Sequence, residues 1–127
     1  MPIADIRLFG GLDDALRQVL DLRQQQMSLI SGNLANADTP GYRARELDFA
    51  NILEGVVRDA EAGDAVAMER VEVIEHLPVT WALDGNSVSA EHEAAKLVAN
   101  RTVYEALAVG VGKHLALLRY AASDGRG

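Results

Sequence analysis

Hydrophobic residues recur at steps of three and four near both ends of the chain, a spacing that predicts two long helices. The first is expected over residues 12–36, after the Gly10-Gly11 pair and before Pro40. We expect its seam, the stripe that packs on another helix, to contain Leu16, Arg23 and Ile30, so that a cation interrupts it. The apolar positions that define this helix are Leu12, Leu16, Val19, Leu20, Met27, Ile30 and Leu34.

The second long helix is expected over residues 89–122 and has the more regular pattern. Ser89 is a suitable N-cap, and Glu91 and Glu93 lie in a solvated first turn, where negative charge is favourable. Its predicted seam follows a heptad repeat: Ala94, Leu97, Arg101, Tyr104, Ala108, Val111, Leu115, Leu118 and Ala122. A helix of about 45 Å, at roughly 1.5 Å per residue, needs a partner along its side, and the first helix is the obvious one.

The middle segment, residues 37–88, is less regular. Its expected parts are an extended or irregular stretch over 42–49, a short helix over 49–62, a mobile loop over 60–68, and a small β-hairpin from the alternation at Val71, Val73 and Trp81. The predicted fold class is therefore mainly α. We expect one domain, 1–127, built as an elongated antiparallel coiled-coil pair of long terminal helices around an irregular middle segment.

Two features suggest that the helices pack on more than each other. Arg23 and Arg101 either extend along the seam into solvent or pair with an acid of a neighbouring helix or chain, which fixes the register. A second stripe of small residues lies away from the predicted seam and suits close contact with another helix, the alternative being local looseness near the chain end. This stripe consists of Ala95, Ala99, Thr102, Ala106, Gly110 and Gly112.

Composition and candidate chemistry narrow the classes of function. The formal net charge of −7 argues against a nucleic-acid partner, and the absence of cysteine excludes disulfides and thiolate chemistry. We expect neither a cleaved secretory signal nor a membrane-spanning segment. His76, His92 and His114 are too widely separated for a predicted metal site, and Asp84-Gly85-Asn86 lacks the further acids of a calcium loop. We therefore predict no metal, no cofactor and no enzymatic activity.

The most informative stretch follows the first helix and reads SGNLANADTPGYRAR from Ser31 to Arg45. Asn33 and Asn36 can bond the free backbone groups at the helix end, and Thr39-Pro40 holds the chain extended. Gly41 then permits a turn that Tyr42 anchors. Taken alone, this is a well-formed helix stop.

This stretch resembles the Asn-x-Ala-Asn-x-x-Thr-Pro-Gly-Tyr signature of the bacterial flagellar basal-body rod and hook family, and is most similar to its B-type proximal rod members. The resemblance continues through Glu46-Leu47-Asp48-Phe49 and returns at Asp84-Gly85-Asn86-Ser87-Val88, which introduces the C-terminal helix in that family. Leu34, where the family often has Ile, and the short polar tail depart from the pattern. The resemblance marks for assembly Asn33, Ala35, Asn36, Thr39, Pro40, Gly41, Tyr42, Arg45, Asp48 and Phe49.

The resemblance implies a structural subunit of the proximal rod, packed helically with other rod proteins into the hollow drive shaft that motility requires. The implied partners are copies of itself, other rod proteins, and the basal-body protein that links the rod to the membrane ring and export gate. The implied location is the periplasmic rod, reached through the flagellar type III apparatus without a cleaved signal. A marginal two-helix seam further predicts a chain that is poorly ordered until it assembles.

The competing hypothesis is a cytoplasmic helical adaptor, or an export-chaperone-like binding module. The acidity and the amphipathic helices favour it, but it leaves the Thr39-Pro40-Gly41-Tyr42 segment unexplained. A small enzyme is the third and least favoured reading, because no convergent polar set for a pocket is visible.

Overall fold

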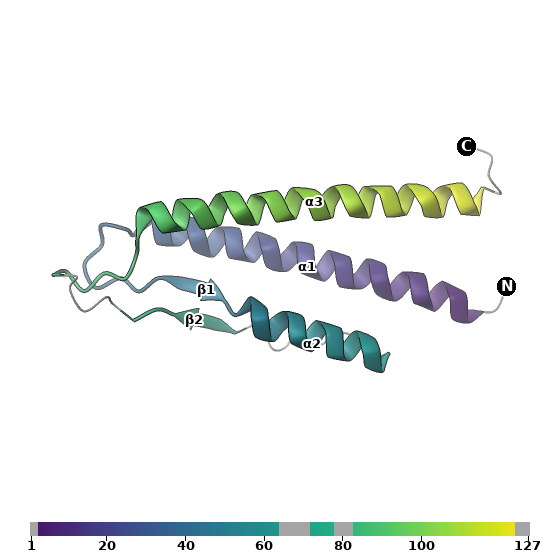
Figure 1. The fold of residues 1–127 in the computed structure, drawn as a ribbon, viewed down its shortest axis with the longest axis horizontal. Helices are drawn as coiled ribbons and strands as arrows, with labels where there is room; N and C mark the ends of the chain where they lie inside the picture. Colours follow the sequence, from purple (N-terminus) through teal and green to yellow (C-terminus); the bar gives the residue numbers. More distant parts are fainter. Residues whose placement is uncertain (1–2, 64–71, 78–82, 124–127) are drawn as a thin grey trace.

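Two long antiparallel helices form the body of the protein, as seen in a computed structural model that describes residues 3–63, 72–77 and 83–123. The elements are α1 (Ile3–Ala35), β1 (Arg45–Leu47), α2 (Phe49–Ala62), β2 (Val73–Glu75) and α3 (Ala90–Ala122). Helices α1 and α3 lie side by side, with the first residues of α1 and the last of α3 at the same end of the molecule (Figure 1). Helix α2 and the sheet lie below the two long helices in the view of Figure 1, and β1 contacts α3 through the Glu46–Lys96 pair. The predicted mainly helical fold is confirmed.

Helix α1 begins at Ile3, so the prediction that Gly10-Gly11 separates it from a short lead is wrong. A glycine inside a helix costs only about 1 kcal/mol relative to alanine, whereas each added residue of an existing helix gains a hydrogen bond. The predicted end is close to the observed one. The helix ends at Ala35, and Asn36 satisfies the carbonyl of Gly32 in the last turn, because its backbone N–H and its Nδ2 both donate to it, at 3.2 and 2.8 Å.

Helix α3 has the predicted bounds and cap. The hydroxyl of Ser89 accepts a hydrogen bond from the backbone N–H of His92 at 3.4 Å, and the helix ends at Ala122. Glu93, however, is not a solvated first-turn residue, because only 3% of it is exposed. It points into the junction of the two long helices, where it has polar partners.

The inward face of α3 is rotated from the predicted one. Leu97, Tyr104, Val111 and Leu118 are half-buried, as a seam requires. The other inward positions lie one residue earlier than expected, at Glu93, Asn100, Leu107 and His114, in place of Ala94, Arg101, Ala108 and Leu115. Leu115 is half-buried as well, whereas Ala94, Arg101, Ala108 and Ala122 are exposed. The apolar pattern failed here because three of the true positions carry polar side chains.

The inward face of α1 contains the predicted Leu16, Arg23 and Ile30, of which Ile30 is buried and the others half-buried. Its most buried apolar side chain, Leu22, was not among the predicted positions, and nor was the buried Gln26. Leu22 forms the small core with Leu47 and Ile52, and Phe49 packs against this cluster from the first turn of α2. The predicted helix over 49–62 is thus confirmed, and its apolar edge attaches it to α1.

The middle segment contains a small two-stranded antiparallel sheet, as expected, but its two strands are not consecutive in the way a hairpin requires. Strand β2 pairs antiparallel with β1, with Glu46 opposite Ile74, so the partner of the 73–75 segment is the stretch expected to be irregular. The alternation within β2 was visible, but its partner lies before α2 and was not. Val71, Trp81 and most of the 60–68 loop lie outside the described residues.

Candidate assembly site

The end of the molecule opposite the chain termini, which we call the loop end, is rich in polar contacts (Figure 1). Asn33, near the end of α1, lies at their centre. Its Nδ2 donates to the carbonyl of Arg45 at 2.8 Å and to Oε2 of Glu93 at 2.9 Å. Its Oδ1 accepts from the hydroxyl of Tyr42 at 3.2 Å and from the backbone N–H of Arg45 at 2.9 Å. A carboxamide has two donor hydrogens and two acceptor lone pairs, so every one is used. With 1% of its surface exposed, Asn33 joins α1, the motif loop, β1 and α3.

Asn86, in the turn before α3, holds the motif loop from the other side. Its Nδ2 lies within hydrogen-bonding distance of the carbonyls of Asn36, Ala37 and Thr39, at 3.0, 3.0 and 2.7 Å. Its Oδ1 accepts from the backbone N–H of Val88 at 2.7 Å. The side chain is 7% exposed. The two stretches that carry the family resemblance, far apart in the sequence, are therefore in direct contact.

We call the contact between residues 36–44 and residues 84–88 the clasp. Backbone hydrogen bonds complete it. Gly41 donates to the carbonyl of Asp84 at 2.8 Å, and Ser87 donates to that of Tyr42 at 3.0 Å. Gly41 has a φ of 75°, a left-handed conformation that side chains disfavour, which explains the glycine predicted to make this turn. The hydroxyl of Ser87 accepts from the N–H of Ala44 at 2.7 Å. The clasp thus fixes the path of the chain from α1 into β1.

A charged network lies beside Asn33. Lys96 Nζ contacts Glu46 Oε2 at 2.8 Å and Glu93 Oε1 at 3.2 Å, and His76 Nε2 lies 2.8 Å from Glu46 Oε1. Burial disfavours the charged form of Glu46, but the hydrogen bonds and charges of Lys96 and His76 outweigh burial and lower its pKa. Burial likewise opposes the charge of Lys96, but Glu46 and Glu93 outweigh it and raise its pKa. The network connects α3 to β1 and to His76, the residue that follows β2.

The two arginines predicted for the seam have different surroundings. Arg23 exchanges hydrogen bonds with Asn100: its Nη1 donates to Oδ1 at 3.2 Å, and Asn100 Nδ2 donates to the Arg23 carbonyl at 2.8 Å. The guanidinium of Arg23 also lies 4.2 Å from the centre of the Phe49 ring, and burial lowers its pKa. Arg101 is not in the seam, since its exposed side chain pairs with Glu105 on the same helix at 2.9 Å.

The remaining motif residues either hold the backbone in place through local hydrogen bonds or lie at the surface. Asp48 caps α2, its Oδ1 accepting from the N–H of Asn51 at 3.3 Å. The hydroxyl of Thr39 donates to Asn36 Oδ1 at 3.2 Å. Ala35, Pro40 and the side chain of Arg45 are exposed. The structure therefore gives these last three no role within the chain beyond that of their backbone.

Sequence reasoning missed several polar partners of the motif. Glu46, Asn86, Glu93, Lys96 and Asn100 were not predicted as site residues, although each contacts a predicted one or its network. A usable signal was present in α3. Glu93 and Asn100 are seven residues apart, and seven is the repeat of a coiled-coil position, so polar residues at that spacing can belong to the seam.

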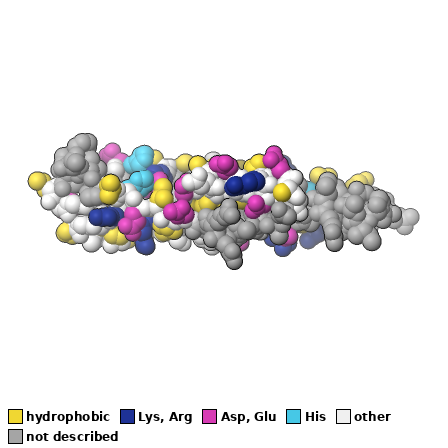
Figure 2. Space-filling view, turned by 90° about the horizontal axis from the view of Figure 1, so that it is seen from below, with side chains coloured by type: hydrophobic (Ala, Val, Ile, Leu, Met, Phe, Trp, Pro, Cys, Tyr) yellow, Lys and Arg dark blue, Asp and Glu magenta, His cyan; other side chains and the backbone are white. Residues whose placement is uncertain are grey.

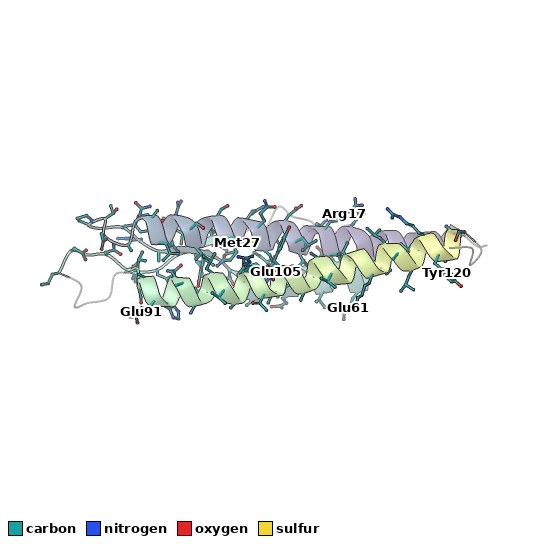
Figure 3. All side chains as sticks on the ribbon, turned by 90° about the horizontal axis from the view of Figure 1, so that it is seen from above. Arg17, Met27, Glu61, Glu91, Glu105 and Tyr120 are labelled. Atoms are coloured by element: carbon teal, nitrogen blue, oxygen red, sulfur yellow. The ribbon has the colours of Figure 1, made fainter. Side chains whose placement is uncertain are left out.

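The outer face of α3 is unusually apolar for a surface. Exposed hydrophobic side chains lie along the whole helix. Among them are Val98, Val109, Leu117 and Tyr120, whose exposed fractions are 57–67%. Figure 3 shows Tyr120 at the terminal end, projecting away from α1. The predicted small residues, Ala95, Ala99, Thr102, Ala106, Gly110 and Gly112, are also exposed. A helix that is apolar on several sides is normally buried on several sides.

The described part of the chain shows no arrangement for metal chemistry, because no three His, Asp or Glu side chains within it are grouped to hold an ion. Over the same residues, no helix combines the length and hydrophobicity needed to span a membrane.

Comparison with known proteins identifies the family of this chain. A family model for the flagella basal body rod protein matches residues 20–43, which include Asn33 and Tyr42. The flagellar basal body rod protein FlgB of Salmonella typhimurium is 33% identical over 117 residues, covering 77% of this chain and 85% of the relative. FlgB of Escherichia coli is 35% identical over the same lengths, and FlgB of Cereibacter sphaeroides is 36% identical over 96 residues, 69% of this chain and 75% of the relative. The chain belongs to the flagellar basal body rod protein family.

Proposed function

We propose that the protein is a structural subunit of the proximal rod of the bacterial flagellar basal body. The observation that carries this is the contrast within α3: its first turns are fixed by buried polar contacts, whereas its outer face is apolar and exposed along the rest of its length. Such a face is stabilised by burial, at about 25 cal/mol per Å² of apolar surface. The names of the relatives support a rod as the structure in which it is buried.

In this proposal the rod lies in the periplasm and the chain reaches it without a cleaved signal. Its partners are further copies, other rod proteins, and the basal-body protein that links the rod to the membrane ring and export gate. No enzymatic activity is part of the proposal. The residues expected to support assembly are those of the motif, from Asn33 to Phe49, and the two long helices, all within one domain.

Deletion of the gene from its source bacterium, followed by complementation with the full chain, tests the function. We expect loss of swimming and of rods in the deletion strain, and recovery of both with the chain, which should co-purify with basal bodies. A chain lacking 38–45 should fail to restore rods, because the clasp loses the segment held by Asn86.

The adaptor hypothesis predicts a different result. An adaptor that binds through its helices would remain in the cytoplasmic fraction with its partner, would be absent from washed basal bodies, and would tolerate the loss of 38–45. Intact rods in the deletion strain would contradict the proposed function.

A further inference from the structure

A groove of about 430 Å³ lies where α1, α3 and the β1–α2 junction meet. Its apolar lining includes Ile30, Leu47, Ala99 and Val103. Ile30 and Leu47 are buried, while Ala99 and Val103 are exposed on α3, so the groove opens to the surface along that helix. A hollow of this size and composition can accept a few side chains of another molecule.

Arg23 supplies a positive charge in this groove and forms no ion pair with a described residue, although two carboxylates, Glu46 (paired with Lys96) and Asp48, also line the groove. Its polar partner is the neutral side chain of Asn100, its face lies on Phe49, and its buried Nε has no hydrogen-bond partner among the described residues. The other cation of the lining, Lys96, contacts two carboxylates. A half-buried guanidinium is most stable beside an anion, which points to an acidic side chain from outside this chain.

Helix α2 presents a matching edge. Leu53, Val57 and Glu61 follow one another at steps of four, so they form one line on the helix surface. Leu53 and Val57 are exposed at 38% and 55%, and Glu61 is exposed. On the face that carries α2 and the sheet, hydrophobic and charged side chains are interspersed (Figure 2), and Glu61 is visible beyond α3 in Figure 3.

Glu61 cannot reach the Arg23 of its own chain. Arg23 lies over Phe49, the first residue of α2, and Glu61 is twelve residues further along that helix, about 18 Å at roughly 1.5 Å per residue. The edge and the groove are therefore complementary only between two molecules.

We propose that the groove of one copy receives the Leu53–Val57–Glu61 edge of α2 of a second copy, with Glu61 paired to Arg23. This contact rests on the proposed function and specifies one of the surfaces through which copies meet. The groove and the edge are different surfaces, so the contact is heterologous. Repetition of a heterologous contact gives a closed ring or an open helical array rather than an isolated pair.

Cross-linking in basal bodies tests the contact, and the absence of natural cysteine makes it clean. Two differently tagged full-length copies, one Val57→Cys and the other Val103→Cys, are co-expressed and treated with a short bismaleimide. Because each copy holds one cysteine, a product containing both tags is intermolecular. The matched control replaces Val103→Cys by Val98→Cys, an exposed valine of α3 that does not line the groove. We expect a mixed product with position 103 and little or none with position 98.

Three results of this experiment are distinguishable. A mixed product specific to position 103 supports the contact. Basal bodies that contain both copies but give no such product, or give it equally with position 98, overturn the contact and leave the proposed function standing. Absence of the chain from basal bodies overturns the proposed function and the contact with it.

A charge exchange gives an independent test in swimming cells. Arg23→Glu and Glu61→Arg should each impair swimming, and the double variant should recover it, because the two charges are reversed together. Arg23→Glu alone could act by disturbing the fold, but recovery by a change on a distant helix edge would not follow from that. Arg17→Glu, at an exposed position of α1, and Glu54→Arg, at an exposed position of α2, are the matched controls. A double variant that is incorporated into basal bodies but does not recover swimming overturns the pairing.

Discussion

The loop end and the terminal end of this molecule use the same two helices in different ways. At the loop end, Asn33, Asn86, Glu93 and Asn100 are buried, and each has a polar partner. Toward the terminal end of α3, Val109, Leu117 and other apolar side chains of its outer face are exposed. Buried polar groups require defined partners, whereas apolar surface requires only cover. The loop end is therefore specified from within the chain, and the terminal end is left to be completed by other molecules.

This difference assigns two tasks to one helix pair. The buried polar contacts accept only one register of α1 on α3, since a shift would separate Asn33 from Glu93 and Arg23 from Asn100. The exposed apolar face of α3 does not constrain the register of α1 on α3, and it remains available for contacts with neighbouring molecules. Substitutions at the two ends should accordingly differ in whether they act on the fold or on assembly.

The largest effect is expected for Asn33→Ala, at the centre of the loop end. Loss of the carboxamide leaves the N–H and carbonyl of Arg45 without a partner and removes one partner of the buried Glu93, which should lower the free energy of unfolding by about 3 kcal/mol or more. Urea unfolding followed by circular dichroism measures the change, and it requires a folded isolated chain, which the buried contacts of the loop end favour over the poorly ordered chain expected from the sequence. Ser31→Ala, at an exposed position two residues away, is the control and should stay within about 0.5 kcal/mol. Equal effects of the two would remove the distinction between the ends.

Asn86→Ala should come next, with a loss of about 1–3 kcal/mol, because three carbonyls lose their shared donor but lie close enough to the surface to find water. Asn86→Asp separates donor from acceptor. It keeps an oxygen for the N–H of Val88 but sets a negative charge against the three carbonyls, so we expect it to destabilise at least as much as alanine does. A harmless Asp variant in thermal unfolding would show that the donated bonds contribute little.

Gly110→Ala and Gly112→Ala test the terminal end. They should raise the stability of the helix but weaken assembly. No atom outside the helix backbone lies within 4 Å of either added Cβ, so each change should stabilise the isolated helix by about 1 kcal/mol. If the small residues allow close approach of another helix, the same variants should swim less well. Ala116→Gly, which lowers helix stability without adding bulk, is the opposite control. Stabilised variants that swim normally would contradict a close contact at these positions.

The smallest effect concerns pH. The folded state lowers the pKa of Glu46, so the stability that this carboxylate contributes is present above its ordinary value of 4.5 and is lost as pH falls through the lowered folded value. Because the groups around it are partly exposed, the contribution is about 1 kcal/mol or less. The difference in free energy of unfolding between wild type and Glu46→Gln should hold at neutral pH and shrink below pH 4.5. A difference independent of pH would mean that the charge is not involved.

Sequence alone determined the parts of this fold that depend on local chemistry. The extent of α3, its Ser89 cap, the end of α1, the positive φ at Gly41 and the short helix over 49–62 all follow from propensity, capping and turn preference within a few residues. The family could also be identified from the motif, because its residues are contiguous.

Tertiary structure decided what depends on distant partners. Strand β2 pairs with β1, from which α2 separates it in the chain, and Leu22 is buried because it packs on Leu47 and Ile52. The inward face of α3 includes Glu93 and Asn100 only because Asn33 and Arg23 lie opposite them. A polar side chain is buried when a partner offsets its loss of water, and that partner is supplied by the folded chain rather than by the neighbouring sequence.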